Sequence, residues 1–475
     1  MNGEDTLLTG LFPNSAARCG AADHATEAAE NTDAAKNTGE AEIAGVKLTE
    51  LAEQYGTPLY LLDVAELKST AERTVAALTG EFARVGASAK LYYASKALLN
   101  QPVARWVTEA GMHLDVASGG ELAVALAAGV DPALIGVHGN NKSREELAAA
   151  VTAGVGSIVV DSAEEVRILQ ETCSEIGGRA TVILRVNSGV HAATHGYLAT
   201  SHEDQKFGVS KSQAAELVAA INAASQLDFQ GIHCHIGSQI FDTAGFKESA
   251  DRMVEIAAEL AQLAEVSELN LGGGFGIAYT PEELPQVPDI AALAAELADI
   301  VAAACEKRGL KIPAVAFEPG RSIVGKAGVT LYRVGVTKTV ELTGSDSEAD
   351  PADLGYKTRR YISVDGGMSD NARPALYGAD YTAVLANRVS DSPLTLSRVV
   401  GKHCESGDIV INRQLLPADI TEGDLLAVAA TGAYCWSLAS NYNYLPRPAI
   451  VALEDGSHRV IVRPVTVSDL VMLSQ

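Results

Sequence analysis

A lysine, a cluster of glycines and two hydroxyl side chains carry the chemistry that this sequence suggests. Lys96 in YYASKA follows a short apolar segment, and a lysine that loses its proton there can form a Schiff base with a carbonyl compound. The glycines of LGGGFG at 271–276 let the backbone approach an anion and present its N–H groups to it. Ser238 and Tyr434 could add hydroxyl donors to the same anion. Pyridoxal phosphate (PLP), an aldehyde with a phosphate group, satisfies both requirements.

Each of these signals is weak by itself, because Lys96 could be a surface lysine and a glycine run could be a tight turn. Glu318 in EPGR strengthens them, since an anionic side chain against the PLP ring nitrogen keeps that nitrogen protonated. His235 in HCHIGS could stack on the ring. His233, two positions earlier on the same strand, has the same parity and is expected to be a hydrogen-bonded structural residue. We choose His235 because it lies nearer the strand end.

The elements that must position these residues are eight short apolar segments, each ending in polar residues or glycines and each followed by a helical pattern. The segments end at YYASKA, HLDVAS, GVHGNNK, IVVDS, ILRVN, HCHIGS, LNLGGGFG and EPGR. Eight such units predict a closed parallel (β/α)8 barrel, or TIM barrel, whose active site is built at the carboxyl ends of the strands. A doubly wound open sheet is the alternative, but it would gather its chemistry at one switch point.

The sequence predicts two domains and an N-terminal extension. Residues 1–42 have no apolar periodicity, so we expect a mobile extension, to which we assign no function. Residues 65–328 are expected to form the PLP-binding barrel. Residues 329–475 show short alternating strands separated by turns, which predicts a C-terminal β-domain of the sandwich or barrel type. The extended TPLYLLD within residues 43–64 is expected to pair with that later sheet.

Composition restricts the partners and the compartment. The formal net charge of −24 argues against nucleic acid and anionic membranes, because both need clustered Lys and Arg. No stretch approaches 18 uninterrupted apolar residues, so no membrane span is expected. The six cysteines show no CxxC spacing, and the N-terminus has no basic flank before an apolar core. These features predict a reducing, cytoplasmic location.

In this order the motifs resemble the PLP-dependent decarboxylases of the alanine racemase fold and, within them, the diaminopimelate decarboxylases. The resemblance rests on YYASKA, HCHIGSQIF, LGGGFG, EPGR, CESGD and GAY, and it covers residues 46–475. It implies decarboxylation of meso-2,6-diaminopimelate to L-lysine and carbon dioxide through a PLP Schiff base, the last step of lysine biosynthesis. It also implies a homodimer with shared active sites and a small amino-acid substrate. No metal ion is expected.

The resemblance assigns a role to each motif residue. Lys96, Cys404 and His235 would be catalytic, as the Schiff-base lysine, the proton donor and the ring-stacking residue. The cofactor would be bound by Lys96, His235, Ser238, Gly273, Gly274, Glu318, Gly320, Arg321 and Tyr434. The substrate would be bound by Arg321, Arg373, Tyr377, Glu405 and Tyr434. Cys404 and Glu405 would come from the second subunit.

Charge counting favours this substrate over others that the fold accepts. The far end of diaminopimelate carries a carboxylate beside an ammonium group, and Arg373 in NARPALY can hold a carboxylate with two parallel hydrogen bonds. An ornithine or arginine decarboxylase is the alternative. A non-catalytic PLP-binding protein is less favoured, because it would lack the C-terminal domain. A racemase places an arginine where Glu318 stands, and a PLP-free Schiff-base aldolase leaves Glu318 unexplained.

Overall fold

The chain forms two compact units. The barrel unit comprises residues 68–277 and 285–323, and the β unit comprises residues 1–67, 278–284 and 324–475. The computed structural model describes residues 10–19, 39–190, 206–342 and 355–474. Residues 278–284 belong to the β unit although they interrupt the stretch of sequence that was expected to form the barrel.

Eight parallel strands close into a barrel. They are β5 (Ala89–Ala94), β6 (His113–Val116), β7 (Ile135–Val137), β8 (Ser157–Val160), β9 (Ala180–Arg185), β10 (Leu227–His233), β11 (Glu268–Asn270) and β12 (Ala314–Phe317). Each strand pairs with the next, and β12 pairs with β5 through Val315 and Ala89, which leaves no edge. The predicted (β/α)8 barrel is therefore confirmed, and an open sheet is excluded because it would have two unpaired edges.

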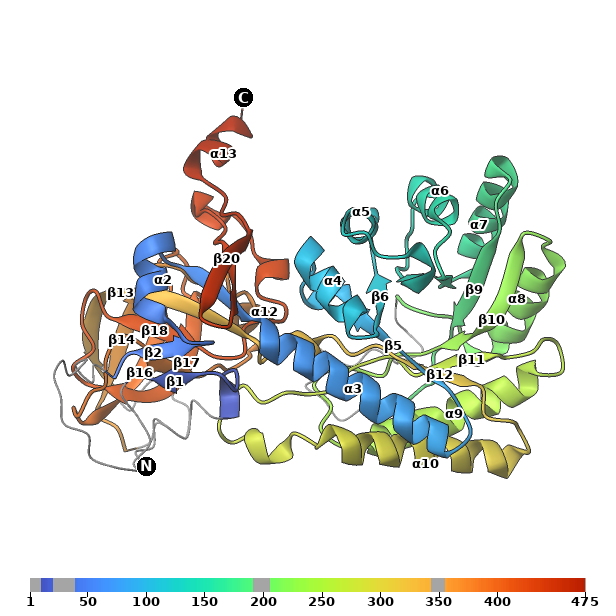
Figure 1. Ribbon diagram of the computed structural model, residues 1–475, viewed down its shortest axis with the longest axis horizontal. Coiled ribbons are helices and arrows are strands. Elements are labelled where there is room, and N and C mark those ends of the chain that lie inside the picture. Colours follow the sequence, from blue (N-terminus) through green and yellow to red (C-terminus); the bar gives the residue numbers. More distant parts are fainter. Residues whose placement is uncertain (1–9, 20–38, 191–205, 343–354, 475) are drawn as a thin grey trace. The chain divides into compact units, whose positions relative to one another are not determined.

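Helices surround these strands (Figure 1). They are α3 (Val64–Arg84), α4 (Gln101–Glu109), α5 (Gly119–Ala127), α6 (Arg144–Ala153), α7 (Ala163–Ile176), α8 (Lys211–Ala223), α9 (Ala244–Leu260) and α10 (Ile290–Arg308). Ser118 and Ser162 cap α5 and α7 by accepting backbone N–H groups of the first helical turn. Both serines follow a barrel strand by two residues, so these loops are short and held at both ends.

The β unit is built on an extended sheet. Its strands are β4 (Leu59–Asp63), β13 (Gly328–Glu341), β14 (Thr358–Val364), β15 (Ala383–Leu385), β16 (Leu394–Val400), β17 (Ile409–Pro417), β18 (Leu425–Val428), β19 (Ile450–Glu454) and β20 (Ser457–Val462). The early strand β4 pairs antiparallel with β13 and parallel with β19. The prediction that TPLYLLD joins a later sheet is confirmed, and this unit is discontinuous in sequence. Short helices α2 (Leu48–Tyr55), α12 (Arg373–Tyr377) and α13 (Val467–Met472) complete it.

Part of the expected N-terminal extension is folded. Leu11 and Phe12 are each only 1% exposed. Strand β1 (Ala17–Arg18) pairs with β2 (Ala41–Ile43), which pairs with β3 (Val46–Lys47). These segments are therefore packed and do not form a mobile extension. The sequence did not indicate this packing, because two adjacent apolar residues in a polar stretch produce no periodic pattern. The remainder of the expected extension, residues 1–9 and 20–38, lies outside the described residues.

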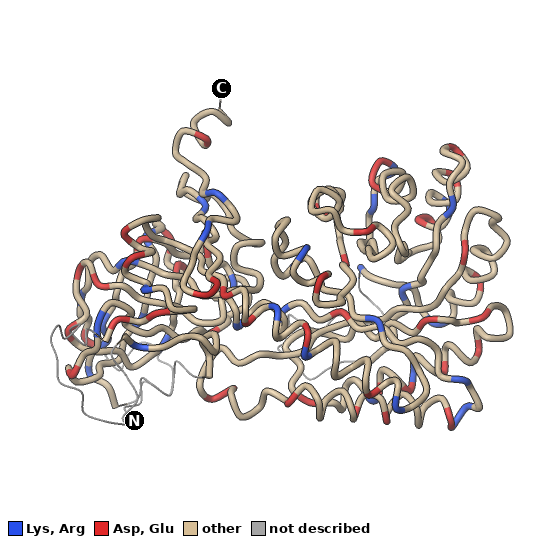
Figure 2. The backbone as a smooth tube through the Cα atoms, viewed as in Figure 1, with Lys and Arg blue, Asp and Glu red and all other residues tan. Residues whose placement is uncertain are grey.

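Charged residues of both signs are interspersed along the backbone of each unit (Figure 2). Many exposed pairs are local, such as Arg167 with Glu164 and Glu171 on α7. Such exposed pairs contribute little to stability but keep opposite charges mixed over the surface. In the part of the chain that the structure describes, no helix is both long and apolar enough to cross a membrane.

Candidate active site

The predicted barrel residues gather at the carboxyl ends of β5, β10, β11 and β12. Lys96 lies in the 3-10 turn Ser95–Ala97 that follows β5, and its side chain is exposed while Ser95 and Ala97 are buried. Its backbone is therefore held by packing while the ammonium group reaches the barrel mouth. His235 lies two residues beyond the end of β10. Burial and then the nearby Lys96 ammonium hold the pKa of His235 well below its usual value, so its imidazole is neutral.

Glu318, the first residue after β12, is a buried and ionised carboxylate. Its Oε1 accepts a hydrogen bond from Nδ2 of Asn270 at 2.8 Å. The Nε2 atoms of His233 and His138 lie 3.2 and 3.3 Å from the same oxygen. Burial by itself would raise the pKa of Glu318, but His233 and His138 hold that pKa well below its usual range. A fixed negative charge of this kind suits a protonated ring nitrogen.

The glycines after β11 allow three loops to approach one another. A Cβ at Gly273 would lie 2.0 Å from the backbone oxygen of Glu318, and one at Gly274 would lie 2.4 Å from that of Gly237. Gly274 also has a φ of 107°, which L side chains rarely adopt. The backbone N–H of Gly273 donates to Nδ1 of His235 at 3.3 Å. The close approach of neighbouring loops, and not only a turn, requires glycine here.

Anion-binding groups lie beside this cradle. Arg321 is only 8% exposed, and its guanidinium donates to the hydroxyl of Ser238 at 2.9 Å, which joins the EPGR and HIGS segments. At Gly320, a Cβ would lie 2.9 Å from the Cβ of Ala94, so the EPGR turn packs directly on the segment that leads to Lys96. With a lysine, a buried carboxylate and a glycine cradle flanked by cationic and hydroxyl donors, the barrel mouth fits PLP.

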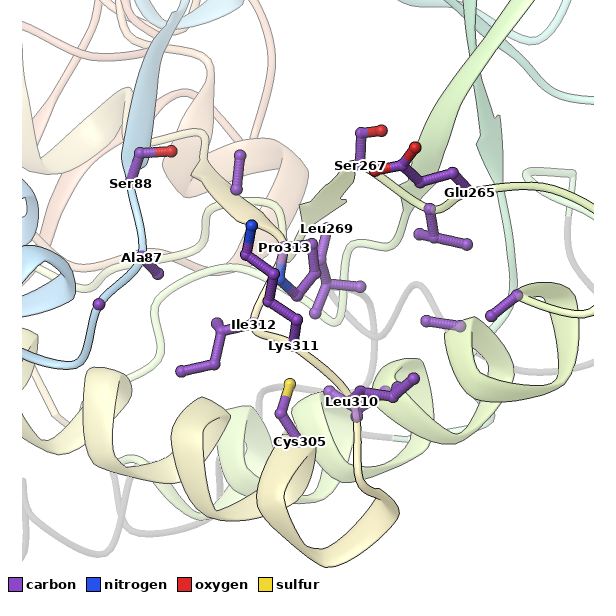
Figure 3. Close-up of a pocket in the computed structure, with 16 residues that line it drawn as sticks. Ala87, Ser88, Glu265, Ser267, Leu269, Cys305, Leu310, Lys311, Ile312 and Pro313 are labelled. Atoms are coloured by element: carbon purple, nitrogen blue, oxygen red, sulfur yellow. The ribbon is translucent and has the colours of Figure 1, made fainter.

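A cavity of about 510 Å³ lies at the opposite ends of the same strands (Figure 3). It is lined in part by Ser88, Ser267 and Pro313, which directly precede β5, β11 and β12. None of the predicted site residues lines this cavity. The candidate active site is therefore at the carboxyl ends of the strands, as in other barrels of this type.

The remaining predicted residues belong to the β unit, where Arg373 is the most informative. It is only 6% exposed at the start of α12. Its guanidinium lies 4.1 Å from the ring centre of Tyr279 and donates to the hydroxyl of Tyr381. Among the described residues, no carboxylate lies within 4.0 Å of it. Arg373 is thus a buried cation held by aromatic rings, which favour cations, without a carboxylate partner in the part of its unit that the structure describes.

Cys404 and Glu405 are exposed on the loop between β16 and β17. The loop is nevertheless anchored, because buried Asp408 accepts the backbone N–H groups of Met368 at 2.6 Å and His403 at 2.8 Å. An exposed thiol on an anchored loop can reach a reacting group without a large rearrangement.

Tyr377 and Tyr434 complete the predicted set in the β unit. Tyr377 ends α12 and is 42% exposed. Tyr434 has a φ of 62°, a strained value for a side chain other than glycine, of the kind that clusters at functional positions.

Sequence reasoning missed several residues that touch the predicted ones. Asn270 and His138 contact Glu318, while Tyr279 and Tyr381 contact Arg373. A signal for the first pair was present, since both are polar residues at the end of, or just after, an apolar barrel strand. No comparable signal marked Tyr279, because it lies within the stretch of sequence assigned to the barrel.

Comparison with known proteins identifies relatives over most of the chain. Residues 69–325 match the family described as pyridoxal-dependent decarboxylase, pyridoxal binding domain. The chain is 47% identical to diaminopimelate decarboxylase of Mycobacterium tuberculosis over 91% of this chain and 94% of that protein. It is 43% identical to the enzyme of that name from Bacillus subtilis, covering 92% and 95%.

Solved structures agree with these sequence relatives. The structure of diaminopimelate decarboxylase from M. jannaschii in complex with L-lysine has a TM-score of 0.81 and 30% identity, over 92% of this chain and 96% of that one. A lysine/ornithine decarboxylase from Vibrio vulnificus has a TM-score of 0.68 and 22% identity, covering 86% and 97%, and shares the fold.

Proposed function

Since this chain belongs to the diaminopimelate decarboxylases of the pyridoxal-dependent decarboxylase family, we propose that it converts meso-2,6-diaminopimelate to L-lysine and carbon dioxide. The observation that carries the choice of substrate is the buried Arg373, which has no carboxylate partner among the described residues. The distal carboxylate of diaminopimelate supplies that partner. A diamine-forming decarboxylase would have no such group to offer.

PLP is the cofactor, and the barrel mouth provides its binding groups. Lys96 would hold it covalently, Glu318 would hold the proton of its ring nitrogen, and His235 would lie against the ring. When bound with this nitrogen protonated, PLP supplies a sink for the electrons that the departing carboxylate leaves on Cα. The phosphate would be bound by Ser238, Gly273, Gly274, Gly320, Arg321 and Tyr434.

The substrate's charged groups are matched by residues of both signs. Arg373 and Arg321 bind carboxylates, and the planar guanidinium favours paired hydrogen bonds to them. Glu405 receives the distal ammonium group, while Tyr377 and Tyr434 add hydroxyl groups. After carbon dioxide leaves, the Cys404 thiol would supply the proton for Cα, and the Lys96 amine would displace L-lysine from the cofactor.

The active protein is a homodimer in which Cys404 and Glu405 complete the site of the other subunit. Their exposure is compatible with this arrangement, because a proton donor needs an enclosed setting and a second subunit can enclose an exposed loop. The β unit also exposes large apolar side chains, among them Leu376, Leu438 and Tyr444 at 56%, 38% and 66%. Exposed apolar groups of this size are typical of surfaces that associate.

The cytoplasm is the proposed compartment. None of the six cysteines, all of which lie among the described residues, forms a disulfide, and of these six only Cys404 is exposed, which suits a reducing environment.

The direct test is carbon dioxide release by the purified protein with PLP and either meso-diaminopimelate or L-ornithine, with the amino product identified by mass. We expect lysine from the first substrate and no product from the second. Putrescine from ornithine would instead assign the protein to the diamine-forming branch, and would mean that Arg373 does not select the substrate.

A further inference from the structure

His233 can serve Glu318 only as a hydrogen-bond donor. Its Nε2 lies 3.2 Å from Oε1 and 3.3 Å from Oε2 of the carboxylate, and an ionised carboxylate only accepts. The proton of the ring must therefore be on Nε2. Nδ1 of His233 is buried and has no hydrogen-bond partner among the described residues. A second proton there would be a buried donor without an acceptor, so the geometry favours the neutral ring.

His138 meets the same carboxylate from another strand. Its Nε2 lies 3.3 Å from Oε1 of Glu318 and 3.7 Å from Oδ1 of Asp115, so it too carries its proton on Nε2. Burial lowers the pKa of His138 to about 3, which keeps the ring neutral. Burial, followed by the charge of Glu318, raises the pKa of Asp115 well above its usual value. Of the two carboxyl groups, Glu318 is the one that stays ionised.

Other charged and polar side chains surround the Glu318 carboxylate. Further charged groups that act on this cluster are Lys96, Lys142, Arg185 and Glu121. The ligand atoms of His138, His233 and Glu318 lie within 4.8 Å of one another, a spacing that a metal ion could also use. Asn270, however, directs its amide N–H at Oε1 of Glu318, which suits an anion that collects hydrogen bonds rather than one that binds a cation.

We infer that His233 and His138 are positioning residues which, as neutral Nε2–H donors, hold Glu318 ionised and aimed at the cofactor ring nitrogen. This inference rests on the proposed function, because it concerns how the PLP-binding carboxylate is maintained. Neither histidine is required to touch substrate or cofactor. Their contribution is to fix the charge and direction of a third residue, which then acts on the ring.

The test compares His233→Leu, which removes the donor, with His233→Gln, which retains an N–H near the position of Nε2. The first readout is the visible absorbance of the bound cofactor as a function of pH, without substrate. The second is kcat and KM for diaminopimelate. We expect His233→Leu to move the absorbance midpoint by about one pH unit and to lower kcat about 10-fold with KM changed less than about 3-fold. His233→Gln should recover most of both effects.

His113→Leu is the matched control. His113 is a partly buried histidine at the start of β6, whereas Asp115 lies near the end of that strand. The ring centres of His113 and Tyr92 are 4.9 Å apart. This variant should leave the absorbance titration unchanged. If His233→Leu does not fold, the pair His138→Leu and His138→Gln gives the same comparison. Equal effects of Leu and Gln, or an unshifted titration in the Leu variant, would overturn the inference.

A double variant separates this role from general damage. In a Glu318→Gln background, His233→Leu should change kcat by less than about 2-fold, because the residue through which it acts is already gone. Independent, additive losses would contradict the inference. The absorbance titration needs no substrate, so a shifted titration in a protein that releases no carbon dioxide would refute the proposed substrate and leave the positioning role intact.

Discussion

The two units treat a buried charge in opposite ways. In the barrel unit, Glu318 is surrounded by N–H groups of Asn270, His233 and His138, so its charge is compensated inside one subunit. In the β unit, Arg373 is held between Tyr279 and Tyr381, with no carboxylate within 4.0 Å among the described residues. A buried charge costs several kcal/mol unless it is paired. The compensated carboxylate suits the proposed site of a permanently bound cofactor, whereas the uncompensated guanidinium suits the proposed binding of a substrate carboxylate that comes and goes.

The largest effect is expected for Lys96, the residue of the barrel unit that is proposed to bind PLP covalently. Lys96→Ala should abolish both turnover and the visible absorbance of bound PLP, because Lys96 is the residue proposed to hold the cofactor covalently. Absorption spectra and carbon dioxide release measure the two losses. Lys311→Ala is the control, since Lys311 is exposed beside the cavity at the opposite end of the strands and should change neither. A variant that kept its absorbance and turnover would disprove the assignment of Lys96.

The next largest effect is expected for Arg373, the buried charge of the β unit that has no carboxylate partner among the described residues. Arg373→Leu should cost about 2–5 kcal/mol in kcat/KM for diaminopimelate, as expected when a buried charge pair loses one partner. A substrate without the distal carboxylate should lose far less. Arg463→Ala provides a control in the same unit, because that arginine is exposed and paired with Asp469. An equal loss on both substrates would show that Arg373 supports the fold and not the choice of substrate.

Sequence patterns predicted those features whose residues are neighbours in the chain, and they did not predict contacts between residues far apart in the chain. The strand ends that carry Lys96 and Glu318 were predictable, because each is a contiguous apolar run followed by polar residues. The contacts of Glu318 with His138 and of Arg373 with Tyr279 were not, since they join elements about a hundred or more residues apart. The packing of Leu11 was missed because two apolar residues give no period. Only closure of the fold brings such groups together.

Sharing of the site between subunits gives the third prediction. Mixing Lys96→Ala with Cys404→Ala subunits, each inactive alone, should restore activity toward about one quarter of wild type if one of the two sites in each heterodimer is intact and subunits pair at random. Size-exclusion chromatography and mass spectrometry would verify that heterodimers form. Heterodimers without recovered activity would place Cys404 in the site of its own subunit or outside the chemistry.

The smallest effect is expected for the protonation of His138, which lies beside Glu318 in the barrel unit. The folded pKa of His138 is lowered to about 3, so the unfolded chain binds its proton first as the pH falls below the usual histidine value of 6.5. Stability contributed by the neutral ring is therefore complete above about pH 6.5 and is lost progressively toward pH 3. His138→Gln should remove this dependence, with the slope differing from wild type by at most about 1.4 kcal/mol per pH unit between pH 6 and pH 4.5.

Urea unfolding at a series of pH values measures this difference. Above pH 7 the stability curves of wild type and His138→Gln should run parallel, because the histidine is then neutral in both the folded and the unfolded chain. Parallel curves at pH 5 as well would mean that His138 is charged when folded. Glu318 would then form an ion pair with His138 and would not be held by neutral N–H donors. The proposed difference between the surroundings of Glu318 and those of Arg373 would then be wrong.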